Sequence, residues 1–190
     1  GNGGRACVNA SAIWTPRNAD AIALGLAKKL AGVKARPWDD PNCEVSAFAK
    51  PEVAEAINDM VEVGLRTPGA RDVTQEVRGS PRLVKEGRCA WLLPTIIRCD
   101  SPEHPLANKE FLFPYASVIE YPRADVLKRI GYTLAATALT DDPALIAECM
   151  ACPNIERLNI GLLPTNRLTW DQPHEGNLFT HLYKQRALQP

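Results

Sequence analysis

The sequence lacks an excess of charge of either sign. Its 190 residues carry 22 basic and 22 acidic side chains, which gives a net charge of zero at pH 7. Nucleic acids and anionic membranes attract proteins through a basic excess, so there is no electrostatic reason to expect either partner. The sequence also lacks a secretory signal and an apolar run long enough to cross a bilayer. We therefore expect a cytoplasmic protein that binds no nucleic acid and no membrane.

Residues typical of metal and hydrolase sites are scarce. There are only three histidines, and none has ligand spacing to the C-x-x-C pair formed by Cys149 and Cys152. This pair ends a helical pattern just before Pro153, so we interpret it as thiols packed at a helix end, with no metal. His104 and His174 stand beside prolines, and we expect both at the surface. No serine lies in a triad-like motif, which leaves hydrolase chemistry without support.

Short apolar runs alternate with helical patterns along most of the chain. The expected strands are 10–14, the two parts of 89–98 on either side of Pro94, 116–121, 132–139 and 155–160. The expected helices are 19–31, 51–64, 122–130 and 143–150. We expect Asn18 to cap the first helix and Asp142 to cap the last. We interpret 33–49 as a loop and 66–87 as a loop with one short strand.

This alternation predicts an α/β fold, a three-layer α/β/α domain with a mainly parallel open sheet. Hydrophobic residues make up 45% of the chain, which is enough for one substantial core. No internal repeat or linker divides the sequence. We count residues 1–190 as one domain.

The beginning of the chain carries the strongest functional signal. The glycine-rich run GNGGRA precedes Cys7, and an apolar stretch follows it. Glycines allow another backbone, a cofactor or a substrate to approach closely, and a thiol at such an edge is a candidate nucleophile. The competing interpretation is a small core residue, which is common for a cysteine between alanine and valine.

The pattern Asn2-x-Gly4-x-x-Cys7 resembles the nucleophile motif N-x-G-Q-x-C of the aldehyde dehydrogenase superfamily, with Arg5 in place of the glutamine. Further segments resemble the family in the same order along the chain. They are the Pro-Thr pair at 94–95, the E-x-F-G-P-like segment 110–114, the Y-G-L-x-A-like segment 132–136 and the pair at 158–159. The family's glycine-rich segment after Asn159 is absent, so the resemblance is to a divergent member.

The resemblance implies an oxidoreductase that uses NAD or NADP. The Cys7 thiolate attacks an aldehyde to form a thiohemiacetal, hydride leaves to the cofactor, and water or coenzyme A releases the thioester. The backbone N–H of Cys7 helps to hold the oxyanion, and Asn2 supports the loop or the substrate. Glu110, with Leu112 of the same motif, contacts the cofactor, since a carboxylate accepts from both ribose hydroxyls. For Arg5 we favour a structural role.

The family places its nucleotide-binding domain upstream of the cysteine motif. This chain begins at Gly1 without methionine, and its glycine run precedes a strand, whereas a dinucleotide fingerprint follows one. We therefore expect the catalytic domain of a larger two-domain enzyme. Its partners would be an aldehyde, the nucleotide-binding domain of the same protein and further copies in a homo-oligomer. The alternatives are an inactive or assembly module with this fold, a coenzyme A-acylating variant, and a free-standing cysteine transferase or hydrolase.

Overall fold

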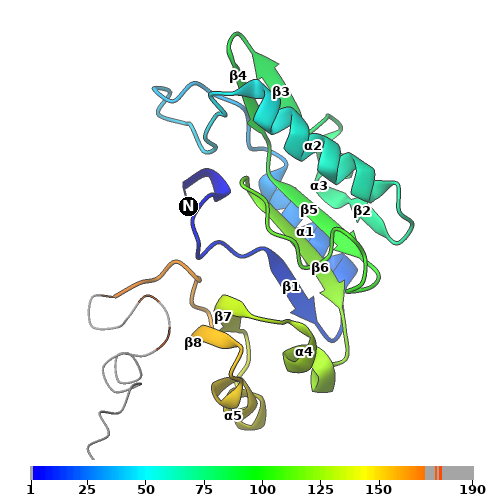
Figure 1. Cartoon of the computed structure of the whole chain (residues 1–190), viewed down its shortest axis with the longest axis vertical. Coiled ribbons are helices and arrows are strands. Elements are labelled where there is room, and N and C mark those ends of the chain that lie inside the picture. The colour runs from blue at the N-terminus through cyan, green and yellow to red at the C-terminus, as the bar shows by residue number, and fades with distance from the viewer. Residues whose placement is uncertain (1, 170–173, 175, 177–190) are drawn as a thin grey trace, which may run out of the picture. The chain divides into compact units, whose positions relative to one another are not determined.

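The computed structural model describes residues 2–169, 174 and 176 (Figure 1). The chain forms two compact units, residues 1–126 and 127–190. The interpretation of 1–190 as one domain of a larger enzyme remains a prediction. Among the described residues, no helix combines the length and the apolar character needed to cross a bilayer.

The first unit is built on a four-stranded sheet with the order β1-β6-β5-β2. Strands β1 (Ala12–Thr15) and β5 (Thr95–Cys99) both run parallel to β6 (Tyr115–Glu120). Only β2 (Ala70–Asp72), at the edge beside β5, is antiparallel. The expected mainly parallel sheet is thus confirmed.

Helices cover both faces of this sheet. Successive residues of β5 and β6 point to opposite sides, and both sides carry apolar residues that helices bury. The residues on one side are Ile96, Ala116 and Val118, which pack with Ala19, Ala23 and Ala27 of α1 (Ala19–Leu30). The residues on the other side are Ile97, Cys99 and Ile119, which pack with Ala54, Ile57 and Val61 of α2 (Pro51–Leu65). Each fully buried valine or isoleucine side chain among them contributes roughly 1.5–3 kcal/mol. The result is the expected α/β/α arrangement (Figure 1).

The apolar run 89–98 bends at Pro94, as expected, but its two parts join different sheets. The first part is β4 (Cys89–Leu92), which pairs with β3 (Leu83–Glu86) in a separate antiparallel hairpin. The second part is β5 of the main sheet. The segment 66–87, which we expect to be a loop with one short strand, instead contains the two strands β2 and β3 and a short helix, α3 (Val73–Arg78). Asp72 caps this helix by accepting from the backbone N–H of Gln75 at 2.8 Å.

Helix α1 begins through a tertiary contact rather than through its expected cap. Asn18 adopts a left-handed backbone conformation, and its side chain makes no capping hydrogen bond. Instead the backbone N–H of Ala19 donates to the Glu120 carboxylate at the end of β6, at 3.1 Å. A carboxylate satisfies one of the unpaired donors of a helix N-terminus and interacts favourably with its dipole.

A buried ion cluster lies inside the first unit. The guanidinium of Arg82 is fully buried and pairs with Asp72 at 2.6 Å and Glu62 at 2.5 Å. It also donates to the side-chain oxygen of Asn58 at 3.1 Å. Because a buried charge is costly without such partners, these contacts permit the burial of Arg82.

The second unit contains a parallel β-α-β motif. Strands β7 (Thr133–Ala138) and β8 (Ile155–Ile160) are connected by α5 (Pro143–Ala151), and α4 (Arg123–Arg129) crosses the boundary between the two units. Asp142 caps α5 as expected, by accepting from the N–H of Ala144 at 2.9 Å.

Candidate active site

Cys7 lies on a tight loop that precedes β1. Asn2–Gly4 form a short 3-10 segment (η1) that is kinked at Gly3, and Gly3 and Gly4 have positive φ angles of 59° and 79°. A second turn follows, closed by the N–H of Asn9 donating to the carbonyl of Ala6 at 3.0 Å, and it carries Cys7. The Cys7 side chain is exposed. The interpretation of Cys7 as a small core residue is therefore wrong.

The motif glycine Gly4 lies directly against a distant segment. A Cβ atom at Gly4 would come within 2.2 Å of the backbone at Phe113 and Pro114. No side chain fits there, and the positive φ of Gly4 independently favours glycine. This contact brings the Cys7 loop against the segment 110–114, which the family resemblance assigns to the cofactor.

Arg5 holds the same loop in place. Its Nε donates to the carbonyl of Leu112 at 3.2 Å, and its other nitrogens donate to the carbonyls of Ser46 and Ala47 at 3.3 Å. The guanidinium also stacks over the Phe48 ring at 4.2 Å, a favourable cation–π distance. Burial lowers the pKa of Arg5. These contacts give Arg5 the structural role that we favoured.

The segment 110–114 alternates between exposed and buried side chains. Glu110 is exposed, and Leu112 is 57% exposed. Phe113, which stands where the family motif has glycine, is buried in the main core beside Tyr115. Its ring lies 5.8 Å from that of Tyr115, and the Phe111 ring lies 4.8 Å from the same tyrosine. The departure from the motif thus adds an aromatic core residue.

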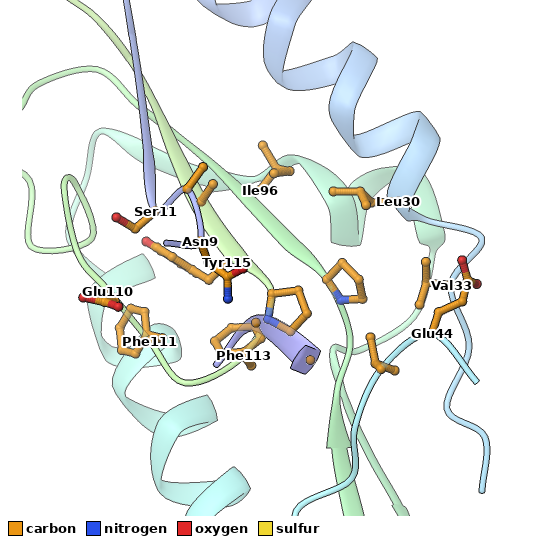
Figure 2. Close-up of a pocket in the computed structure, with 17 residues that line it drawn as sticks. Asn9, Ser11, Leu30, Val33, Glu44, Ile96, Glu110, Phe111, Phe113 and Tyr115 are labelled. Atoms are coloured by element: carbon orange, nitrogen blue, oxygen red, sulfur yellow. The ribbon is translucent and has the colours of Figure 1, made fainter. Parts of the chain in front are cut away.

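A cavity of about 370 Å³ lies between the Cys7 loop and the segment 110–114 (Figure 2). Among its lining residues are Gly3, Gly4, Asn9 and Ser11 from the N-terminal segment, and Glu110, Phe111, Phe113 and Tyr115. It lies where β1, β5 and β6 begin. Of the predicted site residues, Glu110 lines the cavity, whereas Cys7 and Leu112 lie outside its lining. Asn2 lies in the 3-10 turn next to Gly3.

Two lining residues were missed from the sequence. The side-chain nitrogen of Asn9 is completely buried and has no hydrogen-bond partner among the described residues. Its place two residues after Cys7 was the only sequence signal for it. Glu44 comes from the segment 33–49, where no periodicity or motif marks it.

The other candidate positions have structural explanations. His104 is buried, at 7% exposure, and this corrects our surface assignment. Its Nδ1 accepts from the N–H of Leu106 and its Nε2 donates to the carbonyl of Thr67, each at 3.1 Å, so backbone groups satisfy both ring nitrogens. His174 is exposed, as expected.

The cysteine pair lies at the C-terminal end of α5, the helix end at which we expect it. Cys149 is buried at the end of α5, where burial raises its pKa, and Cys152 follows the helix as its C-cap. None of the six cysteines, all within the described part of the chain, forms a disulfide. The described residues contain no group of three or more acidic, histidine or cysteine side chains suited to a metal ion.

Solved structures show which fold this is. An oxidoreductase from Marinobacter aquaeolei is 16% identical with a TM-score of 0.72; the match covers 93% of this chain and 36% of that one. Glyceraldehyde-3-phosphate dehydrogenase from Methanocaldococcus jannaschii, in complex with NADP, is 17% identical with a TM-score of 0.73, over 93% and 37% of the two chains. Lactaldehyde dehydrogenase from Escherichia coli is 15% identical with a TM-score of 0.69, over 84% and 33%.

No protein-family model and no curated protein sequence matches the chain. The structural matches nevertheless show that the chain has the aldehyde dehydrogenase fold, as the motif resemblance implied. The chain spans about a third of the length of the proteins that it matches.

Proposed function

We propose that this chain is the cysteine-bearing catalytic domain of an NAD(P)-dependent aldehyde dehydrogenase. The observation that carries this proposal is the contact between the Cys7 loop and the segment 110–114. Gly4 leaves no room for a side chain against Phe113, and Arg5 donates to the Leu112 carbonyl. Two motifs more than 100 residues apart in the sequence, with complementary roles in the family they resemble, are thus in contact, and this supports a shared site.

The exposure of Cys7 supports its role as nucleophile. We propose that its thiolate attacks the aldehyde carbon, so that a carbon–sulfur bond forms and the carbonyl π electrons move to oxygen. From the family resemblance we propose that the backbone N–H of Cys7 helps to hold that oxyanion. For Asn2 we propose the role that the family resemblance implies, support of the loop or of the substrate. After the hydride has left, the acyl group would remain on sulfur as a thioester, and attack by water or coenzyme A would release the acid or the acyl-coenzyme A and return the Cys7 thiol.

The residues present fit a nicotinamide cofactor. Glu110 presents an exposed carboxylate at a cavity, and such a group accepts hydrogen bonds from both hydroxyls of a ribose. Leu112 adds an exposed apolar surface beside it. NAD or NADP, when bound, accepts the hydride. In the intact protein we propose that a nucleotide-binding domain supplies most of this cofactor site and that the enzyme is a cytoplasmic homo-oligomer.

The proposal is tested by following the carbonyl carbon of an aldehyde. Benzaldehyde labelled with ¹³C at the carbonyl is added to the chain, and NMR is used to detect the tetrahedral carbon of a thiohemiacetal. We expect this signal with the wild-type chain and its loss in Cys7→Ser, while Cys89→Ser retains it. If Cys7→Ser leaves the signal unchanged, Cys7 is not the nucleophile.

A second measurement addresses the inactive-module alternative. In the full-length protein, aldehyde-dependent NADH formation should be abolished by Cys7→Ser and retained in Cys89→Ser. An inactive or assembly module would form no NADH in either variant or in the wild type.

A further inference from the structure

We propose that an exposed flank of α2 binds the same flank of a second copy of this chain, with the two α2 helices antiparallel and Glu52 of each copy paired with Arg66 of the other. This contact goes beyond the proposed function, which assigns no surface to the expected homo-oligomer. It also does not depend on the role of Cys7.

Four exposed apolar residues of α2 form a continuous stripe beside its buried side. They are Val53, Ala56, Met60 and Val63, and their spacing of three, four and three residues places them on one face of the helix. Val53, Met60 and Val63 are 40%, 53% and 59% exposed, whereas α1 exposes only one large apolar side chain, Leu24. Single exposed apolar residues are normal, but a continuous stripe is typical of a contact surface.

A row of three charged residues borders the stripe at seven-residue intervals. Glu52, Asp59 and Arg66 are all exposed, and none of them makes an ion pair with another described residue. The other two acids of α2, Glu55 and Glu62, lie further around the helix and are already in ion pairs within the chain. The unpaired charges of α2 and its C-cap therefore lie along the open edge of the stripe. Figure 1 shows α2 at the outer edge of the first unit, where a second helix can lie beside it.

The stripe and the row of charges are complementary to a second copy of themselves. A two-fold axis perpendicular to the helix, midway between Ala56 and Met60, makes two such helices antiparallel. Val53 then faces Val63 of the second copy, and Ala56 faces Met60, so that a small side chain lies opposite a long one. The row of charges of one helix lies beside the same row of the other, because antiparallel helices bring identical edges together.

This arrangement forms the ion pair between Glu52 and Arg66 twice, once at each end of the contact. Asp59 opposes it, because it lies beside the axis and meets Asp59 of the second copy, and like charges across an interface are destabilising. The stripe is also short, since the ten residue steps from Val53 to Val63 span about 15 Å. A contact of this size belongs to the class of small, transient interfaces. We therefore expect a reversible dimer.

Sedimentation equilibrium of the purified chain at pH 7, over about 10–500 µM, measures the association. We expect a monomer–dimer equilibrium for the wild type. Met60→Gln places an amide in the middle of the stripe and should weaken the dimer about tenfold. Leu24→Gln makes the same kind of change on the exposed face of α1 and should leave the dimer unaltered. A chain that stays monomeric throughout, or a dimer that responds equally to both changes, would overturn the proposal.

Charge reversal tests the antiparallel register. Glu52→Arg and Arg66→Glu should each weaken the dimer about fivefold, because each change brings like charges together at both ends of the contact. The two changes combined restore both ion pairs, so the affinity should return to within about twofold of the wild type. In a parallel pair, residues 52 and 66 lie about 21 Å apart along the axis and cannot rescue each other. Absence of rescue would therefore refute the antiparallel contact.

Asp59 provides a change in the opposite direction. Asp59→Asn removes the like charges beside the axis and should strengthen the dimer about threefold. Asp39→Asn, at an exposed position of the segment 33–49, serves as the control and should leave the dimer unaltered. If Asp59→Asn does not strengthen the dimer, two copies do not meet at Asp59 and the proposal is wrong. Circular dichroism of each variant establishes that it is folded.

Discussion

At the scale of single residues, the candidate site depends on what glycine allows. Gly4 combines a φ of +79° with backbone atoms of Phe113 and Pro114 where a side chain would begin. Because Gly4 lies so close to this segment, the side chain of Arg5, the next residue, can donate to the Leu112 carbonyl. The approach of the two segments and the hydrogen bond that fixes it therefore come from adjacent positions.

We expect Gly4→Ala to destabilise the chain more than Gly87→Ala does. Gly87 also has a positive φ, of +56°, but a Cβ there meets nothing within 4 Å. The left-handed conformation costs each alanine about 1–2 kcal/mol, and the overlap at Gly4 adds about 1–3 kcal/mol. Urea unfolding followed by circular dichroism measures both. Equal losses in the two variants would contradict the close approach at Gly4.

At the scale of the elements, helix packing depends on which face a small residue occupies. Gly25 lies on the exposed side of α1, and a Cβ there meets nothing within 4 Å. Gly64 lies on the buried side of α2, where a Cβ would come within 2.5 Å of the Leu106 side chain. Leu106 is itself only 2% exposed, so it has little freedom to move away.

These two glycines should therefore respond to alanine in opposite directions. Gly25→Ala should stabilise the chain by about 0.5–1 kcal/mol, because alanine loses less backbone entropy in a helix. Gly64→Ala should destabilise it by about 1–3 kcal/mol through overpacking against Leu106. Thermal and urea unfolding of the two variants and of the wild type measure these changes in stability. A stabilising Gly64→Ala would mean that α2 does not pack closely on Leu106.

At the scale of the whole molecule, the free energy of unfolding depends on pH in the alkaline range because two buried groups, the Cys99 thiol and the Tyr115 hydroxyl, can lose a proton. Burial raises the pKa of Cys99 from 9.0 to about 12 and raises the pKa of Tyr115 as well. The folded chain keeps protons that the unfolded chain releases in this range. The contribution of Cys99 to stability is therefore complete below about pH 9 and is lost as the pH rises from 9 to about 12. That of Tyr115 is complete up to its ordinary pKa of 10.0 and falls only above it.

We expect Cys99→Ala to flatten this pH dependence. The free energy of unfolding of the wild type should fall steeply above pH 9, and that of Cys99→Ala should fall less because one of the two groups is gone. The exposed Cys7→Ala serves as the control and should follow the wild type. Urea titrations at pH 7, 9, 10 and 11 provide the measurement. If the three proteins lose stability in parallel as the pH rises, the pKa of Cys99 is the same in the folded and the unfolded chain, and the prediction is wrong.

We also expect the 190-residue chain alone to bind NAD weakly and to form no NADH from aldehyde. Glu110 supplies one charged hydrogen bond, which contributes roughly 1.5–3 kcal/mol. A micromolar site requires roughly 8 kcal/mol. Calorimetric titration of the chain with NAD is the direct measurement. Micromolar binding would show that this chain carries a complete cofactor site.

The sequence by itself determined most of the helices and strands and the positions of the motifs, but not α3 or both strands of the segment 66–87. Periodicity is a local property, so it located α1, α2 and β8 within a few residues, and the Asp142 cap was evident beside Pro143. The sequence also reveals the motif around Cys7 and the segment 110–114, because each of them lies within a short stretch of chain.

Only the tertiary structure decided which distant groups meet. The carboxylate of Glu120 accepts from the first N–H of α1, at Ala19, which lies 101 residues away in the sequence. The burial of Arg82 depends on its ion pairs with Asp72 and Glu62. Asn9 and Glu44 come to one cavity although no spacing links them. Such contacts depend on how strands and helices stack, and local hydrophobic patterns do not encode the identity of a partner across the fold.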